Sequence, residues 1–512
     1  MADQPNVLVF FTDQQRADTV RALGNPHIQT PTMDSLVHEG TSFTSAYCAS
    51  PVCIASRCSM VLSQWAHQTD CTTNCPMPQE STSFMEVFQD AGWRTHGVGK
   101  MHFSPESHKL WGFDSRDYSE EGGWREDDDY CRFVHEHGYD HVFECMGPRS
   151  EYYYIPQVSQ LPARLHNTTW VADRSLEFLQ QRDSDRPFML WSSFIKPHPP
   201  FESPTPWHRL YKPTDVTLPH LPADYEAMLT YWNRRQNRYK YRDQGWDDNF
   251  IRTMRAAYAA CVSFVDYNAG RVLDYLRETG EIDNTIVLWT ADHGEMLGDL
   301  GSFGKRSVFD SAARVPMIVR YPERFAAGEV CDTVCSLVDV APTLLEGCGL
   351  ETIDQHEGAD LAEVAQGDRP DRPGVLVQYS QEASGLYGLI DDDYKYVYSA
   401  ADDQEWLYRR WPDEQEERSL AGNQAYVKTT ADMRERLTVW LRADGYTDVL
   451  AEDGWKVYPP EDRPSVDENP DHGLLYQEGT NWAPLFPEGY APISTPQGPV
   501  RIAPRKGDGK GS

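Results

Sequence analysis

The 512-residue sequence lacks any uninterrupted apolar run long enough to cross a membrane. Its first residues lack the basic and long apolar segments of a signal peptide, so we expect a chain without a cleaved leader. Basic residues are few, because 47 lysines and arginines stand against 79 aspartates and glutamates, a formal net charge of −32. This excess argues against nucleic acid or an anionic membrane as the main partner. An anionic substrate would therefore need a local basic pocket.

Cysteine is present, but not in a zinc pattern. The eleven cysteines are an odd number, and those between Cys48 and Cys75 have spacings that match no common zinc site. A chain of this length can bury a large core and does not need disulfide bonds to fold. We therefore expect mostly buried, free thiols and a reducing, cytoplasmic location.

Continuous apolar runs predict strands that are buried on both faces of a parallel sheet. The predicted strands cover residues 7–11, 188–195, 284–290 and 315–321. Helical periodicity is found at residues 170–181, 250–279 and 336–347. From residue 374, short strands alternate with turns, and a helix is expected over 429–441. The sequence predicts an α/β fold: a large, mostly parallel mixed sheet flanked by helices, with a smaller C-terminal antiparallel-sheet α+β subdomain.

These changes in the sequence pattern divide the chain into three parts. We expect a main domain over residues 1–373 and the small-sheet subdomain over 374–457. Residues 458–512 are rich in proline and glycine, a composition typical of disorder. Large apolar side chains such as Trp482 and Phe486 are scattered through them, so we expect an extended arm packed against a neighbouring subunit.

Polar residues come shortly after three of the predicted strands. Asp13 and Gln14 follow the first, His198 the second, and Asp292 and His293 the third. The carboxyl ends of parallel strands meet at one edge of a sheet, so these side chains are expected to lie together. Carboxylate, amide and imidazole ligands suit one divalent ion such as Ca²⁺ or Mn²⁺ better than a thiolate zinc site. The alternatives are a helix-capping Asp13 and an ordinary turn at His198.

A helix is predicted to begin near Cys53, after a proline that suits a first helical turn. Cys53 and Arg57 then share one face, one turn apart, at a helix end that favours an anion. Two grouped cations such as Lys100 and His102 would be costly to bury without an anion between them. The alternatives are a structural cysteine near a surface arginine, and a surface lysine beside an unrelated histidine. The local positive charge that the acidic chain requires would come from Arg57, Lys100, His102, His198 and Lys305.

Two polar segments are interpreted as solvated. Residues 106–147 are acidic and glycine-bearing, and no apolar periodicity would hold their carboxylates in place. Residues 231–242 are rich in arginine, lysine and tyrosine, and are interpreted as a solvated helix face.

As an ordered set, these motifs resemble the type I sulfatase family of the alkaline phosphatase superfamily. The resemblance covers most of residues 5–445, through Asn6–Asp13, Cys53–Arg57, Gly99–His102, His198–Phe201 and Thr290–Glu295 with Lys305. It implies a sulfuric ester hydrolase, similar to arylsulfatases, that cleaves sulfate monoesters. It also implies that a formylglycine-generating enzyme oxidises Cys53 to Cα-formylglycine. The metal ligands that it implies are Asp13, Gln14, Cys53, Asp292 and His293.

The resemblance also implies catalytic roles. A hydroxyl group of hydrated formylglycine would attack sulfur, while Lys100 and Lys305 neutralise the nonbridging oxygens. Arg57 would hold the hydrate, and His198 would assist the leaving group. His102 would then take the proton from the second hydroxyl group, which expels sulfate and restores the aldehyde.

Several residues depart from the commoner family pattern. Gln14 and His293 resemble the subgroup that contains phosphonate monoester hydrolases and choline sulfatases, and Asn74 is placed like that subgroup's substrate-contacting asparagine. That subgroup uses long C-terminal arms in oligomers, so a homo-oligomer, a dimer or tetramer, is expected. Ala55 stands where the family's commoner modification motif has proline.

Lys100 and His102 are sulfatase-like, so we expect sulfate esters as substrates, with phosphonate or phosphate diesters as side reactions. The main alternative is a phosphonate monoester or phosphodiester hydrolase with the same machinery. A two-zinc phosphatase would need a Ser or Thr nucleophile in place of Cys53. A non-catalytic anion-binding protein would keep Cys53 as a thiol.

Overall fold

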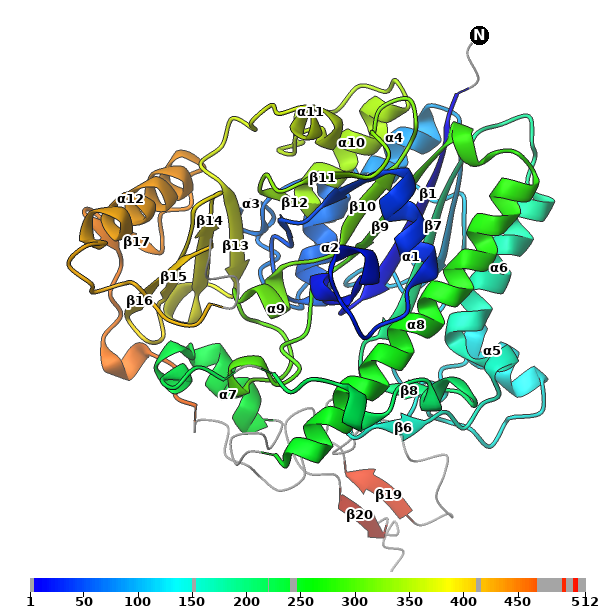
Figure 1. The fold of residues 1–512 in the computed structure, drawn as a ribbon, viewed down its shortest axis with the longest axis horizontal. Helices are drawn as coiled ribbons and strands as arrows, with labels where there is room; N and C mark the ends of the chain where they lie inside the picture. Colours follow the sequence, from blue (N-terminus) through cyan, green and yellow to red (C-terminus); the bar gives the residue numbers. More distant parts are fainter. Residues whose placement is uncertain are drawn as a thin grey trace, which may run out of the picture.

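The computed structural model describes residues 4–149, 153–219, 221–239, 246–410 and 416–466, and the backbone of two strands at 490–493 and 501–504. At its centre is an eight-stranded sheet with the order β11-β2-β10-β9-β1-β7-β4-β5 (Figure 1). Neighbouring strands from β9 to β5 are parallel, whereas β10 is antiparallel to both β9 and β2. The strands are β1 (Asn6–Asp13), β2 (Thr41–Phe43), β4 (Arg94–Gly99), β5 (Ser115–Tyr118), β7 (Phe188–Pro197), β9 (Thr285–Ala291), β10 (Met317–Arg320) and β11 (Glu329–Cys331).

The central strand β1 divides its side chains between two hydrophobic cores. Val7, Val9 and Phe11 belong to one core, and Leu8 and Phe10 belong to the other. Successive side chains of a strand point to opposite faces, so a strand that is covered on both faces needs an unbroken apolar run. This is why β1 could be predicted from its sequence.

Helices cover both faces of this sheet (Figure 1). The core of Val7 contains residues of α2 (Cys53–Leu62), α4 (Phe84–Asp90) and α10 (Val340–Gly347). The core of Leu8 contains residues of α1 (Pro31–Glu39), α5 (Asp129–Glu136), α6 (Asn167–Gln181) and α8 (Asp248–Glu278). Among the described residues, no helix combines the length and the apolar character needed to cross a membrane.

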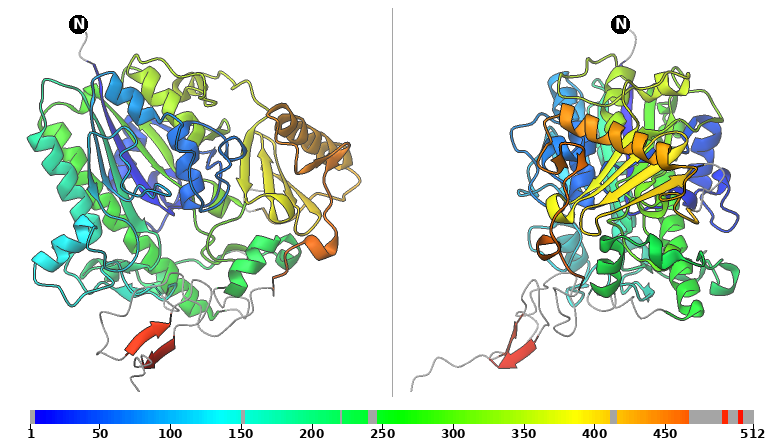
Figure 2. Two further views of the ribbon diagram at one scale, coloured as in Figure 1. Left: turned by 180° about the vertical axis from the view of Figure 1, so that it is seen from behind. Right: turned by 90° about the vertical axis from the view of Figure 1, so that its left-hand side faces the viewer.

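A second, antiparallel sheet is formed by β13 (Val375–Tyr379), β14 (Leu386–Ile390), β15 (Tyr394–Ser399) and β16 (Gln404–Arg409). Helix α12 (Val427–Ala443) lies across it (Figure 2). Leu386, Tyr396 and Leu437 belong to the same core as Val9 of the main sheet, so the two sheets share one hydrophobic interior. The predicted fold class is confirmed.

The remaining elements are short, with the exception of α7. They are β3 (Ala46–Tyr47), α3 (Ala66–Thr69), β6 (Gln157–Val158), β8 (Glu202–Ser203), α7 (Tyr231–Tyr239), α9 (Asp310–Ala313), β12 (Cys335–Ser336), α11 (Leu361–Ala365), β17 (Leu450–Ala451), β18 (Gly454–Trp455), β19 (Tyr490–Ile493) and β20 (Arg501–Pro504). The predicted arm lies outside the described residues beyond Val466, apart from the backbone of β19 and β20.

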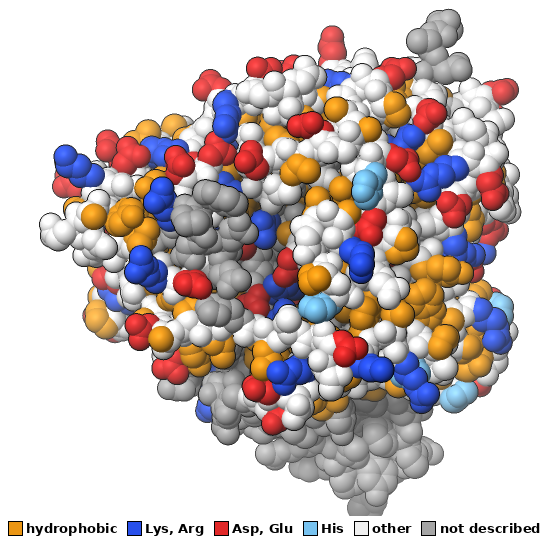
Figure 3. All heavy atoms as spheres, in the orientation of Figure 1, with side chains coloured by type: hydrophobic (Ala, Val, Ile, Leu, Met, Phe, Trp, Pro, Cys, Tyr) orange, Lys and Arg blue, Asp and Glu red, His pale blue; other side chains and the backbone are white. Residues whose placement is uncertain are grey.

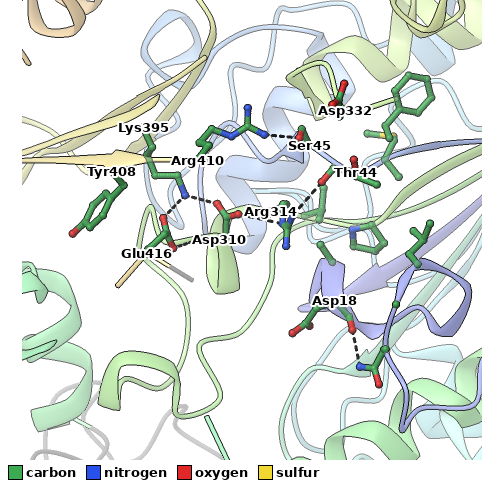
Figure 4. Close-up of a pocket in the computed structure, with 18 of the residues that line it drawn as sticks. Asp18, Thr44, Ser45, Asp310, Arg314, Asp332, Lys395, Tyr408, Arg410 and Glu416 are labelled. Atoms are coloured by element: carbon green, nitrogen blue, oxygen red, sulfur yellow. Dashed lines mark hydrogen bonds and ion pairs between the residues drawn. The ribbon is translucent and has the colours of Figure 1, made fainter. Parts of the chain in front are cut away.

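A cavity of about 930 Å³ lies at the junction of the two sheets (Figure 4), and none of the predicted site residues lines it. On its wall, the buried Lys395 lies between two carboxylates, with its Nζ 2.6 Å from Glu416 Oε1 and also bonded to Asp310. Burial and the neighbouring Asp310 raise the pKa of Glu416 to about 7, although Lys395 opposes this. On the face of the molecule that Figure 3 shows, acidic and basic side chains are intermingled.

Two segments differ from their predicted solvated state. Within residues 106–147, β5 joins the edge of the main sheet, and Glu120 and Asp128 are buried. Helix α7 buries Asn233 and Gln236 instead of lying open to solvent. Both segments bury polar side chains, which an apolar pattern cannot reveal.

Candidate active site

The carboxyl ends of the parallel strands bring the predicted residues together. Asp13 is the last residue of β1, Asp292 follows β9, and His198 follows β7. The register between β1 and β7 shifts between Thr12 and Asp13, so the ladder breaks where the site begins. Gln14, the next residue, has φ 66°, a left-handed turn that ends the strand. Polar side chains therefore replace the apolar run at the sheet edge.

Helix α2 begins at Cys53, and every residue of this helix is buried. The N–H group of Ile54, in the first turn, donates to Asn74 Oδ1 at 3.2 Å. Asn74 thus satisfies one of the donors that a helix leaves unpaired at its start. Cys53 and Arg57 are predicted to share one face of this helix. The structure agrees, because Asp13 contacts both side chains.

Four of the predicted metal ligands form one cluster. Ligand atoms of Asp13, Cys53, Asp292 and His293 all lie within 4.8 Å of one another, and all four residues are buried. The fifth, Gln14, shares a partner with the cluster, because Lys305 Nζ lies 2.9 Å from Gln14 Oε1 and 2.8 Å from Cys53 Sγ.

The cluster fits a divalent cation. His293 Nδ1 lies 2.9 Å from the carbonyl oxygen of Gly294, so this nitrogen carries the proton and donates it there. In the neutral ring, Nε2 then presents its lone pair, 3.3 Å from Cys53 Sγ and 3.6 Å from Asp292 Oδ1. Two carboxylates, an amide oxygen and an imidazole nitrogen form a donor set for Ca²⁺ or Mn²⁺.

Arg57 is fully buried and binds both carboxylates of the cluster. Its Nε lies 3.0 Å from Asp292 Oδ2, and its Nη2 lies 3.3 Å from Asp13 Oδ2. Nη1 donates to the carbonyl oxygen of Lys100 at 2.7 Å. Asp13 and Asp292 are held in place by these bonds, so Arg57 orients the acids that would meet the cation.

Positive charge converges on the thiol of Cys53. Burial alone would raise the pKa of this thiol, but the charges of Lys100 and Lys305 oppose it, and the pKa is held well below its ordinary value. A hydrogen bond with His102 acts in the same direction. Around Cys53, the site therefore offers the local positive charge that an anionic substrate of this acidic chain would need.

His198 is buried and held from both sides. Its Nδ1 lies 2.7 Å from the carbonyl oxygen of Pro199, and its Nε2 lies 3.2 Å from the hydroxyl group of Tyr153. Burial lowers the pKa of His198 to about 4, although the neighbouring Glu121 acts in the opposite direction.

Three side chains of the site were not predicted from the sequence. Glu121 Oε2 contacts Lys100 Nζ at 2.8 Å, and Glu295 accepts hydrogen bonds from Gln14 and from Tyr154. The amide group of Gln236 pairs with the backbone N–H and C=O groups of Lys305. One signal was available for Glu121: buried cations need nearby carboxylates, and the segment after β5 is acidic.

Comparison with known proteins defines the class of this site. The sulfatase family profile matches residues 5–350, more than half of the chain, so the chain belongs to the sulfatase family of the alkaline phosphatase superfamily. A second profile, the C-terminal part of N-sulphoglucosamine sulphohydrolase, matches residues 298–443. The family uses a metal and a formylglycine residue. The predicted family and hydrolase class are confirmed.

Individual relatives cover nearly the whole chain. The arylsulfatase of Clostridium perfringens is 29% identical over 486 residues, which is 87% of this chain and 96% of that protein. The multifunctional alkaline phosphatase superfamily protein PehA of Trinickia caryophylli is 27% identical over 488 residues, with 85% and 95% covered. The structure of the phosphonate monoester hydrolase of Agrobacterium radiobacter is 21% identical, has a TM-score of 0.74, and covers 89% of this chain and 100% of that one, which shows a common fold.

Proposed function

We propose that this chain hydrolyses sulfate monoesters, aryl sulfates among them, with a formylglycine residue made from Cys53 and one divalent cation, Ca²⁺ or Mn²⁺. The observation that carries this proposal is the position of Cys53, at the start of α2 and between the acidic cluster and Lys305. A separate formylglycine-generating enzyme would carry out the oxidation. Hydrated formylglycine supplies the oxygen that attacks sulfur.

The other residues would act on the substrate's oxygens. Lys100 and Lys305 would face the nonbridging oxygens as their charge grows, and Asn74 would contact the substrate. His198 would give a proton to the departing oxygen, and His102 would take the proton that releases sulfate. Asp13, Gln14, Asp292 and His293 would hold the cation, which supplies further positive charge near those oxygens.

Three further proposals concern the whole chain. We keep the division into a catalytic domain (1–373), a small-sheet subdomain (374–457) and an arm (458–512) that packs between subunits of a dimer or tetramer. The buried phenyl, indole and aliphatic groups shared by the two sheets support treating the first two as one folding unit. The free state of all eleven cysteines supports a reducing, cytoplasmic location.

Peptide mass spectrometry on Cys53, combined with turnover of an aryl sulfate, tests the proposal. We expect the loss of mass that converting a –CH₂SH group into an aldehyde requires. Cys53→Ala should abolish turnover while the thermal midpoint stays within a few degrees, because alanine suits a helix and removes only the nucleophile. An unmodified thiol with no turnover would contradict the proposal, as would full activity of Cys53→Ala.

The alternative activity is tested with the same preparation. His293 in the cation cluster and Gln14, which shares the partner Lys305 with it, favour a phosphonate monoester or phosphodiester hydrolase as the second candidate. Rates on an aryl sulfate and on the matching aryl phosphonate monoester should differ in favour of the sulfate. A much faster reaction of the phosphonate would replace the first proposal by the second.

A further inference from the structure

A carboxylate that is not among the predicted metal ligands lies beside the cations that would handle the substrate. Glu121 follows β5, and only 10% of its side chain is exposed. Its Oε2 lies 2.8 Å from Lys100 Nζ, 3.1 Å from His198 Nε2 and 3.5 Å from Arg149 Nη1. Burial raises the pKa of Glu121, but His198, Lys100 and Arg149 outweigh it and keep this group ionised. A charged group of this kind is costly to bury unless its position is needed.

The ring of His198 is oriented so that one nitrogen alone faces the site. Its Nδ1 lies beside the carbonyl oxygen of Pro199, which only accepts hydrogen bonds, so Nδ1 donates. A proton for a leaving group must therefore come from Nε2 of the doubly protonated ring, the form that the carboxylate of Glu121 favours against the effect of burial. Nε2 is the atom that lies beside Glu121 and Tyr153.

We propose that Glu121 is a positioning residue that holds His198 Nε2 toward the departing oxygen of the substrate. The proposal rests on the hydrolytic function given above. The reaction step is a displacement at sulfur. An oxygen of the formylglycine hydrate would form a bond to sulfur as the sulfur–oxygen ester bond breaks, and the electron pair of the broken bond would go to the departing oxygen. The proton on Nε2 of the doubly protonated His198 would move to that oxygen, leaving a neutral ring. The carboxylate of Glu121 forms no covalent bond in this step.

The alternative is that Glu121 affects the reaction by positioning Lys100. That ammonium group also bonds to Asp13, itself held by Arg57, so it keeps an anionic partner when Glu121 is removed. His198 would lose the carboxylate that most favours its protonated ring, and would keep the side chains of Tyr153 and Cys53 as hydrogen-bond partners. Loss of Glu121 should therefore affect His198 more than Lys100.

This difference predicts an uneven loss of activity. An ester of a weakly acidic phenol needs a proton on the departing oxygen, because its phenolate is a poor leaving group. The phenolate of a strongly acidic phenol departs without that proton. For Glu121→Gln we expect kcat for phenyl sulfate to fall by roughly 10²-fold, within the range of general acid catalysis. The kcat for 4-nitrophenyl sulfate should fall less than about threefold by the same reasoning. KM should stay level or fall, because removing a negative charge favours an anionic substrate.

The experiment uses full-length, formylglycine-containing protein and a series of aryl sulfates with graded phenol acidity. The control Glu126→Gln removes the same charge from an exposed position on the same segment, and should leave the whole series unchanged. Glu121→Asp keeps the charge but shortens the reach by one methylene group, and should give an intermediate slope. It also replaces Glu121→Gln if that variant fails to fold.

Two results would overturn the proposal. The first is an equal loss across the series, which would place the effect on Lys100 or on folding. The second is an undiminished effect of Glu121→Gln in a His198→Ala background, because residues that act through one another are not additive. Wild-type turnover is measured first and tests the proposed function alone. If the wild type prefers aryl phosphonates, the same series is run on those esters.

Discussion

The buried lysine at the junction of the two sheets makes the stability of this fold testable. Lys395 is 1% exposed, and its ammonium group is bonded to the carbonyl oxygen of Val308 and to the carboxylates of Asp310 and Glu416. Lys395→Met keeps most of the side chain's length but removes the charge. Removing one partner of a buried ion pair leaves an uncompensated charge, a loss of about 3–5 kcal/mol.

The loss should depend on pH, and its sign follows from Glu416. The folded-state pKa of Glu416, about 7, lies above its ordinary value of 4.5, so between these values the folded chain binds one more proton than the unfolded chain. The contribution of this group is favourable at low pH and is lost as the pH rises through about 7. Without Lys395 this pKa rises further, at about 1.4 kcal/mol per unit. The deficit of Lys395→Met should therefore be about 1–2 kcal/mol larger at pH 8 than at pH 5.5.

Urea unfolding followed by tryptophan fluorescence measures both quantities. Lys428→Met is the control, because Lys428 is an exposed residue on α12 and its loss should change stability by less than about 0.5 kcal/mol. The reasoning fails if the two variants unfold at the same urea concentration. It also fails if the deficit of Lys395→Met is the same at the two pH values.

Two further predictions concern the groups that hold the site. Gly294→Ala would place a Cβ atom 2.1 Å from the carbonyl oxygen of Ser311, so His293 should shift and the affinity for Ca²⁺ or Mn²⁺, measured by calorimetry, should fall; unchanged affinity would contradict this. Gln236→Leu would leave the backbone N–H and C=O groups of Lys305 without their partner, and should cost about 1–3 kcal/mol of stability. It should also lower kcat/KM for an aryl sulfate about tenfold, since a displaced electrostatic group loses much of its effect; lowered stability with unchanged kinetics would show that Lys305 does not depend on Gln236.

The parts of the site that could be predicted share one physical reason. Asp13, His198 and Asp292 lie at the carboxyl ends of β1, β7 and β9, which are buried on both faces and therefore mostly apolar, although two serines interrupt the run in β7. The end of such a run is visible in the sequence, and the sheet geometry then brings the three ends together.

The parts that were missed lack such a marker. Glu121 follows β5, an edge strand with the sequence Ser-Arg-Asp-Tyr, which has no apolar run. Gln236 lies in a helix of mostly polar and basic residues, and its partner is a backbone group of Lys305. A side chain that recognises backbone leaves no complementary residue type in the sequence, so only the folded chain reveals the pair.

Helix α7 links the small sheet to Lys305, a residue of the proposed catalytic site. Its Gln236 binds the backbone of Lys305, while the N–H group of Tyr231 donates to Asp402 and the indole of Trp232 donates to the carbonyl oxygen of Ser384. Asp402 and Ser384 lie in the connections between strands of the small sheet. A chain shortened to residues 1–373 would therefore keep Lys305 and Gln236 but lose the small-sheet contacts that hold α7 in place. A chimaera that takes its small sheet from a relative would also need the α7 of that relative.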